Sequence, residues 1–134
     1  MKYELDWSHL EQASRPYYSN RHLVSIFTGI DPYDVYDAQI EVCRLNKKSV
    51  SDAWGGQMFV KVFHFLGFNT SDRFIKFDPD TDKPCIMRCI IPGYHSQWWA
   101  FVYQDGIINN KWTIDQWQAR HTNLKITSML QIWI

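Results

Sequence analysis

Residues 97–113, which read QWWAFVYQDGIINNKWT, decide the fold class of this chain. The pair Asp105-Gly106 is a strong turn signal for a β-hairpin, and β-prone residues flank it on both sides. We therefore expect strands over residues 97–103 and 107–113 that pair in an antiparallel hairpin. Further strands are expected over residues 73–77 and 85–91, with one or two more between residues 124 and 134.

The chain before this hairpin has the periodicity of helices. The sequence predicts three of them, over residues 20–28, from 32 to about 45, and 57–66. The second start is the strongest, because Asp31 is a good N-cap and Pro32 suits the first helical position. Helices followed by antiparallel strands indicate an α+β fold and not a doubly wound sheet.

Composition limits the classes of function. The 134 residues fit a single domain, 1–134, and 46% of them are hydrophobic. Lys and Arg number 14 against 14 Asp and Glu, so we expect no nonspecific nucleic-acid binding and no polybasic membrane attraction. No apolar run is long enough to span a bilayer, and the first residues lack the apolar region of a signal peptide, so we expect no secretion.

The three cysteines do not form a metal or disulfide pattern. Cys85 and Cys89 share one face of a predicted strand but lie about 13 Å apart along it. A disulfide requires Cα atoms within about 7 Å, so these two should not pair. Cys43 falls near the end of a predicted helix. We expect buried, reduced thiols.

Other motifs point to structure rather than to chemistry. The stretch 78–82 has the D-x-D-x-D look of a calcium loop, but Lys83 stands where that loop needs Gly and Cys89 where it needs Glu. An exposed turn is expected there. The five histidines show no metal-ligand spacing, so we expect neither a metal nor a cofactor. Trp54-Gly55-Gly56 precedes a helix, and we expect a loop that leads into it.

Tryptophan is abundant, and aromatic residues make up 16% of the chain. Most of these rings are expected to build the core, because aromatic side chains bury much area in a small domain. The remainder would form a contact surface for a partner, and Trp54, Trp98 and Trp99 are the candidate binding residues. Trp98 and Trp99 are adjacent on a strand, so their side chains should point to opposite faces.

Residues 19–36, SNRHLVSIFTGIDPYDVY, resemble the start of a small papain-like cysteine-peptidase family common in bacteriophages and prophages. That family begins C-x-x-R-A-h-x-I-A-T-G-x-x-Y-x-x-V-Y, where h is apolar. The residues that match are Ile26, Thr28, Gly29, Tyr33, Val35 and Tyr36. Leu66-Gly67-Phe68 is similar to a later L-G-[WF] motif, and residues 100–110 are similar to a strand ending A-V-x-D-G-h-h-x-D, with one residue inserted. The resemblance implies a papain-like fold.

The positions that carry catalysis in that family are substituted here. The alignment places Ser19 where the family has its nucleophilic Cys, and Trp98 where it has its His. His95 lies three residues from Trp98, and Asn110, or Asn109 beside it, takes the acid position. A serine hydroxyl is far less acidic than a thiol and needs a positioned base, so Ser19 is better explained as a helix N-cap.

The resemblance therefore implies a catalytically degenerate papain-like protein of phage type, a pseudoenzyme that acts as a binding or structural module. Its partner would be another protein, either a viral structural subunit or a host factor, in the host cytoplasm or in the virion. The alternative is an active peptidase or amidase with Ser19 as nucleophile, His95 as base, and Asn109, Asn110 or Asp115 orienting that base. A third hypothesis is a carbohydrate-binding module that stacks sugars on Trp98 or Trp99.

Overall fold

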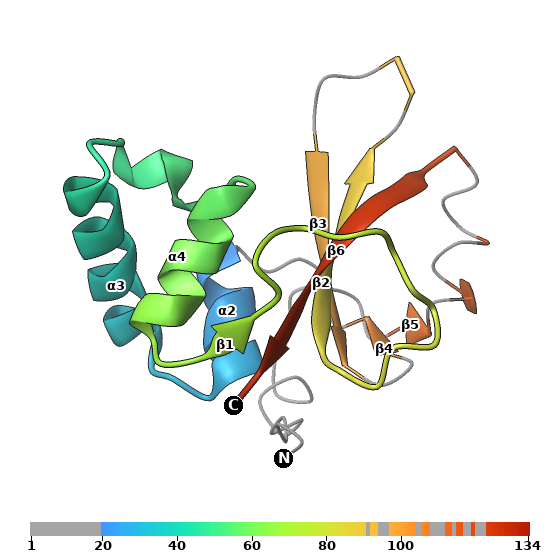
Figure 1. The fold of residues 1–134 in the computed structure, drawn as a ribbon, viewed down its shortest axis with the longest axis horizontal. Helices are drawn as coiled ribbons and strands as arrows, with labels where there is room; N and C mark the ends of the chain where they lie inside the picture. The colour runs from blue at the N-terminus through green and yellow to red at the C-terminus, as the bar shows by residue number, and fades with distance from the viewer. Residues whose placement is uncertain are drawn as a thin grey trace.

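The computed structural model describes residues 20–90, 92–93, 97–103, 106–107, 112–113, 115–116, 119 and 123–134. Within them the helices come first and the strands follow, so the fold is α+β as predicted (Figure 1). The elements in chain order are α2 (Asn20–Thr28), α3 (Pro32–Leu45), the 3₁₀ helix η1 (Val50–Trp54), α4 (Gln57–Phe65), β1 (Asn69–Thr70), β2 (Cys85–Ile90), β3 (Gln97–Tyr103), β4 (Gly106–Ile107), β5 (Trp112–Thr113) and β6 (Lys125–Trp133).

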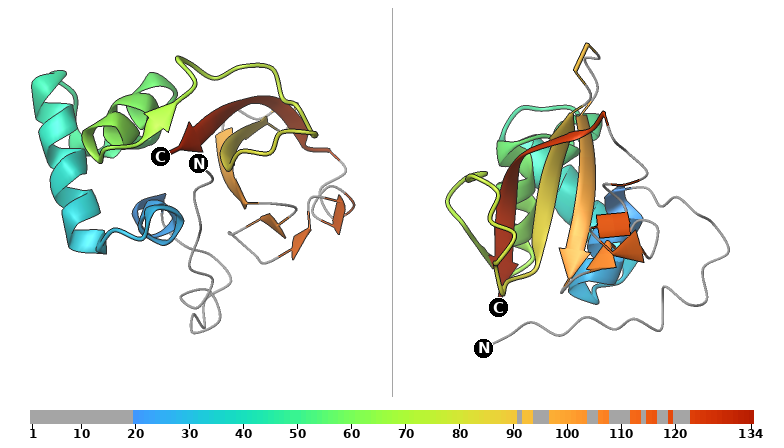
Figure 2. Two further views of the ribbon diagram at one scale, coloured as in Figure 1. Left: turned by 60° about the horizontal axis from the view of Figure 1, so that its bottom comes forward. Right: turned by 90° about the vertical axis from the view of Figure 1, so that its right-hand side faces the viewer.

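The strands form one antiparallel sheet in the order β1-β6-β2-β3-β4-β5. The centre of the sheet is β2, where Met87 is opposite Ala100 of β3 and Met129 of β6. The sheet is strongly curved, and the helices lie on one side of its central strands (Figure 2). The C-terminal strand β6 thus lies next to β2 in the middle of the sheet, far from its neighbours in sequence.

The helix-facing side of the sheet carries the main hydrophobic core. Its fully buried members on the sheet include Ile86, Phe101 and Leu130. Phe27 of α2 contacts Phe101 edge to face, with ring centroids 5.7 Å apart, and Phe59 of α4 contacts the same ring at 6.2 Å. Such pairs add to the stabilisation that burial of aromatic area already gives, so α2 and α4 are both fixed to the sheet.

The opposite side of the sheet carries a second cluster, in which Cys85, Met87 and Cys89 of β2 alternate with the core residues just described. A register shift follows Arg88, because Arg88 is opposite Ser128 while Cys89 is opposite Ile126. One extra residue on β6 makes a β-bulge, and it returns Ile126 to the face of the second cluster.

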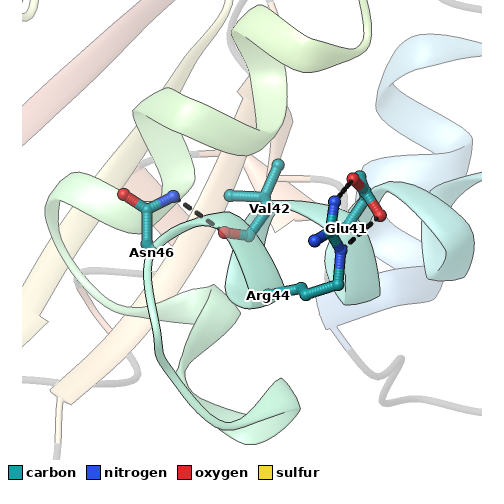
Figure 3. Close-up of polar contacts among 4 residues, drawn as sticks. All are labelled: Glu41, Val42, Arg44 and Asn46. Atoms are coloured by element: carbon teal, nitrogen blue, oxygen red, sulfur yellow. Dashed lines mark hydrogen bonds and ion pairs between the residues drawn. The ribbon is translucent and has the colours of Figure 1, made fainter.

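Local interactions fix both ends of α3. The Asp31 side chain accepts a hydrogen bond from the backbone N–H of Tyr33 at 2.8 Å, which satisfies one of the free donors of the first turn. At the other end Asn46 Nδ2 donates to the carbonyl oxygen of Val42 at 2.7 Å, and Arg44 pairs with Glu41 (Figure 3). A basic residue in the last turn also complements the helix dipole.

The strand predictions agree with the structure except at two places. Residues 73–77, predicted as a strand, contribute a single bridge from Ile75 to Met129. The predicted strand at 107–113 is divided between β4, which pairs with β3, and β5, which pairs with β4. The hairpin itself is confirmed, since Tyr103 is opposite Gly106. Strand β1 and helix η1 were not predicted from the sequence.

Candidate functional site

The predicted catalytic residues are not placed by the structure. Ser19, His95, Asn109 and Asn110 lie outside the described residues, so their roles stay predictions. Asp115, the remaining candidate for orienting the base, is exposed.

The cysteines are buried thiols, as predicted, and none is in a disulfide. Burial raises the pKa of Cys85 and of Cys89 to about 12, because the charged thiolate loses its hydration there. Cys43 is 1% exposed and lies in the last turn of α3, where the helix dipole disfavours a negative charge. A nucleophilic cysteine needs a lowered pKa and access to solvent. Cys85 and Cys89 have a raised pKa and are buried, and Cys43 is buried as well.

Two of the three candidate binding tryptophans are half-buried against α4. The Trp99 ring lies 4.8 Å from that of Phe59 and 5.4 Å from that of Phe74, measured between centroids. Trp54 lies 5.5 Å from the same Phe59. The Trp99 indole therefore takes part in packing between α4 and the sheet, and the Trp54 indole in packing between η1 and α4. Trp98 is opposite Cys89 on the sheet, and its side chain lies outside the described residues.

The acidic stretch 78–82 is an exposed turn, as predicted. Asp78 uses its side chain inside the turn, where Oδ1 accepts from the backbone N–H of Asp80 at 2.9 Å. One of the five histidines, His64, bonds through Nε2 with Thr70 Oγ1 at 2.8 Å. In the described part of the chain, no cluster of three or more His, Cys, Asp or Glu side chains could hold a metal ion.

The Trp54-Gly55-Gly56 stretch leads into α4, as predicted. Gly55 follows η1 and Gly56 is the N-cap of α4, with a φ of +45° and a ψ of −116°. Side chains disfavour this backbone conformation, which explains the glycine. Gly56 also accepts a backbone hydrogen bond from Phe59 at 3.2 Å. The stretch thus acts as a connection between two helices.

A polar group that the sequence analysis did not single out lies in the middle of the sheet. Arg88 of β2 is directly opposite Trp99 of β3 and Ser128 of β6. Directly opposite side chains share a face, and Trp99 packs against the helix-facing core, so these three residues form a row on that face. We call them the Arg88 row. All three are half-buried, whereas Ile86, in the next row, is fully buried.

Two atoms of the Arg88 row have no hydrogen-bond partner. Among the described side chains, the buried nitrogen and oxygen atoms without one are Arg88 Nε and Ser128 Oγ. Of the ion pairs within the described residues, Arg44–Glu41 and Lys83–Asp82, neither involves Arg88. Leaving a buried donor unpaired costs about 1–3 kcal/mol, and more for a charged group. Among the described residues, the guanidinium of this row therefore has no carboxylate that compensates its charge.

The sequence does contain a signal for this residue. Arg88 is the one charged residue in the apolar stretch 85–91, and a charge inside a buried strand needs a partner. Its neighbour Ser128 could not be identified beforehand, because that pairing depends on the bulge in β6 and on the insertion of β6 beside β2.

Apart from the Arg88 row, exposed aromatic and apolar side chains lie on the side of α3 that faces away from the core. Tyr33 is 81% exposed, and Tyr36 and Ile40 are each 37% exposed. Their spacing of three and four residues places them in one stripe, opposite the buried residue Val42. Arg21 of α2 lies over the Tyr36 ring, 4.9 Å from its centroid. We call Tyr33, Tyr36 and Ile40 the α3 outer face.

No family model, curated protein or solved structure matches this chain. Among the described residues, none of the helices has the length and apolar character needed to cross a membrane. The function is therefore inferred from the residues and contacts described above.

Proposed function

We propose that the protein is a non-catalytic binding module of papain-like type that engages another protein through the α3 outer face. The resemblance of residues 19–110 to a phage peptidase family gives the class of partner, a viral structural subunit or a host factor. Folds persist when the sites on them lose their chemistry, so a peptidase fold that serves in binding is physically reasonable.

The observation that carries the proposal is the α3 outer face itself. An exposed tyrosine, a second tyrosine and an isoleucine in one stripe are unusual on a helix that already buries its opposite side. Tyrosine is among the residues that contribute most to binding at protein interfaces. The exposed carboxylates of Asp34 and Asp37 lie on the same helix, so the partner is expected to have an apolar centre with a basic rim.

The thiols support the non-catalytic part of the proposal. Cys85 and Cys89 have a pKa of about 12 and are on strands, and Cys43 is buried at a helix C-terminus. A papain-type nucleophile instead sits at a helix N-terminus, where the dipole stabilises a thiolate. A catalytic role would thus fall to Ser19 with His95 as base, the alternative that the first experiment tests.

That experiment uses a fluorophosphonate probe, which reacts with activated serine hydroxyls. We expect no labelling of the wild-type protein, and the Ser19→Ala variant serves as the matched control. Labelling that is present in the wild type and absent from Ser19→Ala and from His95→Ala would show an active hydrolase and overturn the non-catalytic proposal.

The binding surface is tested by photo-crosslinking in the cells that produce the protein. Benzoylphenylalanine replaces Tyr33 or Ile40, and replaces Asp80 in the exposed turn as a control. We expect both α3 positions to give one and the same protein adduct, which Asp80 does not give and which Asp37→Lys weakens. If neither α3 position gives an adduct, or if the adduct is a second copy of this chain, the proposed surface is wrong.

A further inference from the structure

We propose that the Arg88 row is a binding site for a carboxylate attached to an apolar or aromatic group. This site is separate from the α3 outer face, and the proposal does not depend on that surface or on Ser19. It stands on three observations: the partial exposure of the row, its two unpaired polar atoms, and the aromatic ring of Trp99 within it.

The first observation is that, on the helix-facing side of the sheet, one cross-strand row is fully buried whereas the next row is half-buried. Phe101, Ile86 and Leu130 form a cross-strand row whose members are all 0% exposed. Two residues further along β2, Arg88 and its row partners are half-buried. Part of each residue in this row is therefore exposed to solvent, although the Arg88 Nε and Ser128 Oγ atoms themselves are buried.

The second observation is that two polar atoms of the row have no hydrogen-bond partner within the part of the chain that the structure describes. Arg88 Nε and Ser128 Oγ are buried, come from directly opposite residues, and do not bond to each other. Both can donate a hydrogen bond. An oxygen atom that accepted a hydrogen bond from each of them would satisfy both donors, and a negative charge on that oxygen would compensate the guanidinium. These requirements are met by an oxyanion.

The β-bulge in β6 adds to this arrangement. The shift follows Arg88, and Thr127 Oγ1 donates to the backbone carbonyl oxygen of Arg88 at 3.1 Å. Thr127 thus fixes the backbone of the arginine from the neighbouring strand. Bulges are over-represented near functional sites because they redirect side chains locally.

The third observation selects a carboxylate with an apolar group over a bare inorganic anion. Trp99 stands directly beside Arg88, and Phe59 and Phe74 hold its ring at 4.8 and 5.4 Å between centroids. A flat aromatic surface next to a guanidinium suits a ligand with an apolar body and a planar carboxylate, which arginine binds with two parallel hydrogen bonds. Such a carboxylate belongs either to a free small acid or to the C-terminus of a peptide.

The experiment measures binding to the full chain by calorimetry, with tryptophan fluorescence as a second readout. Benzoate represents the free acid and N-acetylphenylalanine represents a peptide C-terminus. Benzamide and N-acetylphenylalanine amide are the matched neutral compounds. We expect saturable binding of at least one acid, no binding of its amide, and weaker binding as salt is added. The acid that binds more tightly identifies the source.

Variants connect the binding to the row. Arg88→Gln removes the charge and is expected to weaken binding by about tenfold or more. Ser128→Ala removes one donor and should weaken ligand binding by a smaller factor. Arg44 is an exposed residue of α3, so Arg44→Gln should leave ligand binding unchanged. Thermal unfolding of each variant checks that it is folded. If Arg88→Gln does not fold, Arg88→Lys takes its place. Lysine keeps the charge but loses the planar fork, so it too should bind less tightly.

Two results would overturn the proposal. One is that neither acid binds the wild-type protein in a saturable way up to its solubility limit, in which case water alone satisfies the two donors. The other is that an acid binds folded Arg88→Gln, or Arg88→Lys in its place, as tightly as the wild type, or that the amides bind as tightly as the acids.

Discussion

At the scale of single residues, buried polar groups of the described chain are mostly satisfied by the backbone. Gln39 Nε2 donates to the carbonyl oxygen of Val50 at 2.9 Å, and Thr28 Oγ1 donates to that of Val24 at 2.7 Å. These residues stabilise local structure. Arg88 and Ser128 differ because nothing in the described protein compensates them. Polar groups left in this state reduce stability, so a ligand is a better explanation for them than folding is.

Removing the charge of Arg88 should therefore make the protein more stable. We expect Arg88→Met to raise the free energy of unfolding by about 1–3 kcal/mol, because methionine fills similar space without a buried donor. Urea denaturation measures the change, and Arg44→Met is the control. That arginine is exposed and pairs with Glu41, so its replacement should change stability by less than about 1 kcal/mol. A loss of stability in Arg88→Met would mean that the guanidinium is compensated after all.

The buried thiols should make stability fall at high pH. The pKa of Cys85 and of Cys89 is about 12 in the folded protein against an ordinary value of 9.0, so the folded state favours the neutral thiol. Their stabilisation is complete below about pH 9 and is lost as the pH rises toward about 12. At about pH 10 the loss is on the order of 1 kcal/mol per thiol.

The pH effect is measured as the difference between the wild type and a Cys85→Ala/Cys89→Ala variant, because lysines and tyrosines titrate in the same range. We expect the stability of the wild type to decline more steeply between pH 8 and 10. Equal slopes for the two proteins would contradict the burial of these thiols.

At the scale of elements, short connections set where each helix begins. Asp31 caps α3 through its side chain, whereas α4 has no side-chain cap and begins at Gly56. The start of α4 thus depends on a backbone conformation that only glycine adopts without strain. Since α4 carries Phe59 into the core, the placement of this helix affects the packing of the sheet.

Replacing Gly56 should destabilise the protein although there is room for a methyl group. Nothing lies within 4 Å of a Cβ built at this position, so the effect is one of conformation and not of collision. We expect Gly56→Ala to lower the free energy of unfolding by about 1–3 kcal/mol, the usual cost of a sparsely populated backbone conformation. Gly55→Ala is the control, because Gly55 has a φ of −132° that alanine accepts. Equal effects at both positions would show that α4 does not need the φ of +45°.

The elements that the sequence predicted well are those with strong local signals. Helix 20–28 and strand 97–103 have the predicted bounds, and the third helix ends one residue early. The prediction of a strand over residues 73–77 is wrong, since they form a single bridge. A short run of β-prone residues does not determine how much of it pairs with a neighbouring strand. Long-range pairing decides this, and it depends on where β6 enters the sheet.

The candidate site was harder to predict than the fold. The sequence indicated that Trp99 lies on a strand, but it could not show that Arg88 and Ser128 lie in the same cross-strand row as Trp99. Ser128 is 40 residues from Arg88 in the chain, and the bulge in β6 changes which residue is opposite which. Register is fixed by packing across strands, so one sequence alone did not reveal the row.

At the scale of the whole molecule, the side chain of Phe59 joins α4 to the sheet through several aromatic contacts. Phe59 of α4 contacts Trp54 next to its own helix, Phe74 in the connection before β2, and Trp99 and Phe101 on β3. It is 0% exposed. Folding of the helices and of the sheet should therefore be coupled through this ring, and the orientation of Trp99 in the Arg88 row depends on the same contact.

Truncating Phe59 tests this coupling. We expect Phe59→Ala to lower the free energy of unfolding by about 3–5 kcal/mol, since it leaves a cavity where four aromatic rings meet. Phe65→Ala is the matched control on the same helix, because Phe65 is 53% exposed and its loss should change stability by less than about 1 kcal/mol. Urea denaturation followed by far-ultraviolet circular dichroism and by tryptophan fluorescence measures both. If the helices and the sheet are coupled through Phe59, the circular dichroism and fluorescence signals of the wild type change at the same urea concentration. In Phe59→Ala the denaturation midpoint then shifts by the same amount in both signals. A variant in which fluorescence is lost while helical signal persists would mean that the helix layer is stable without its contact to the sheet.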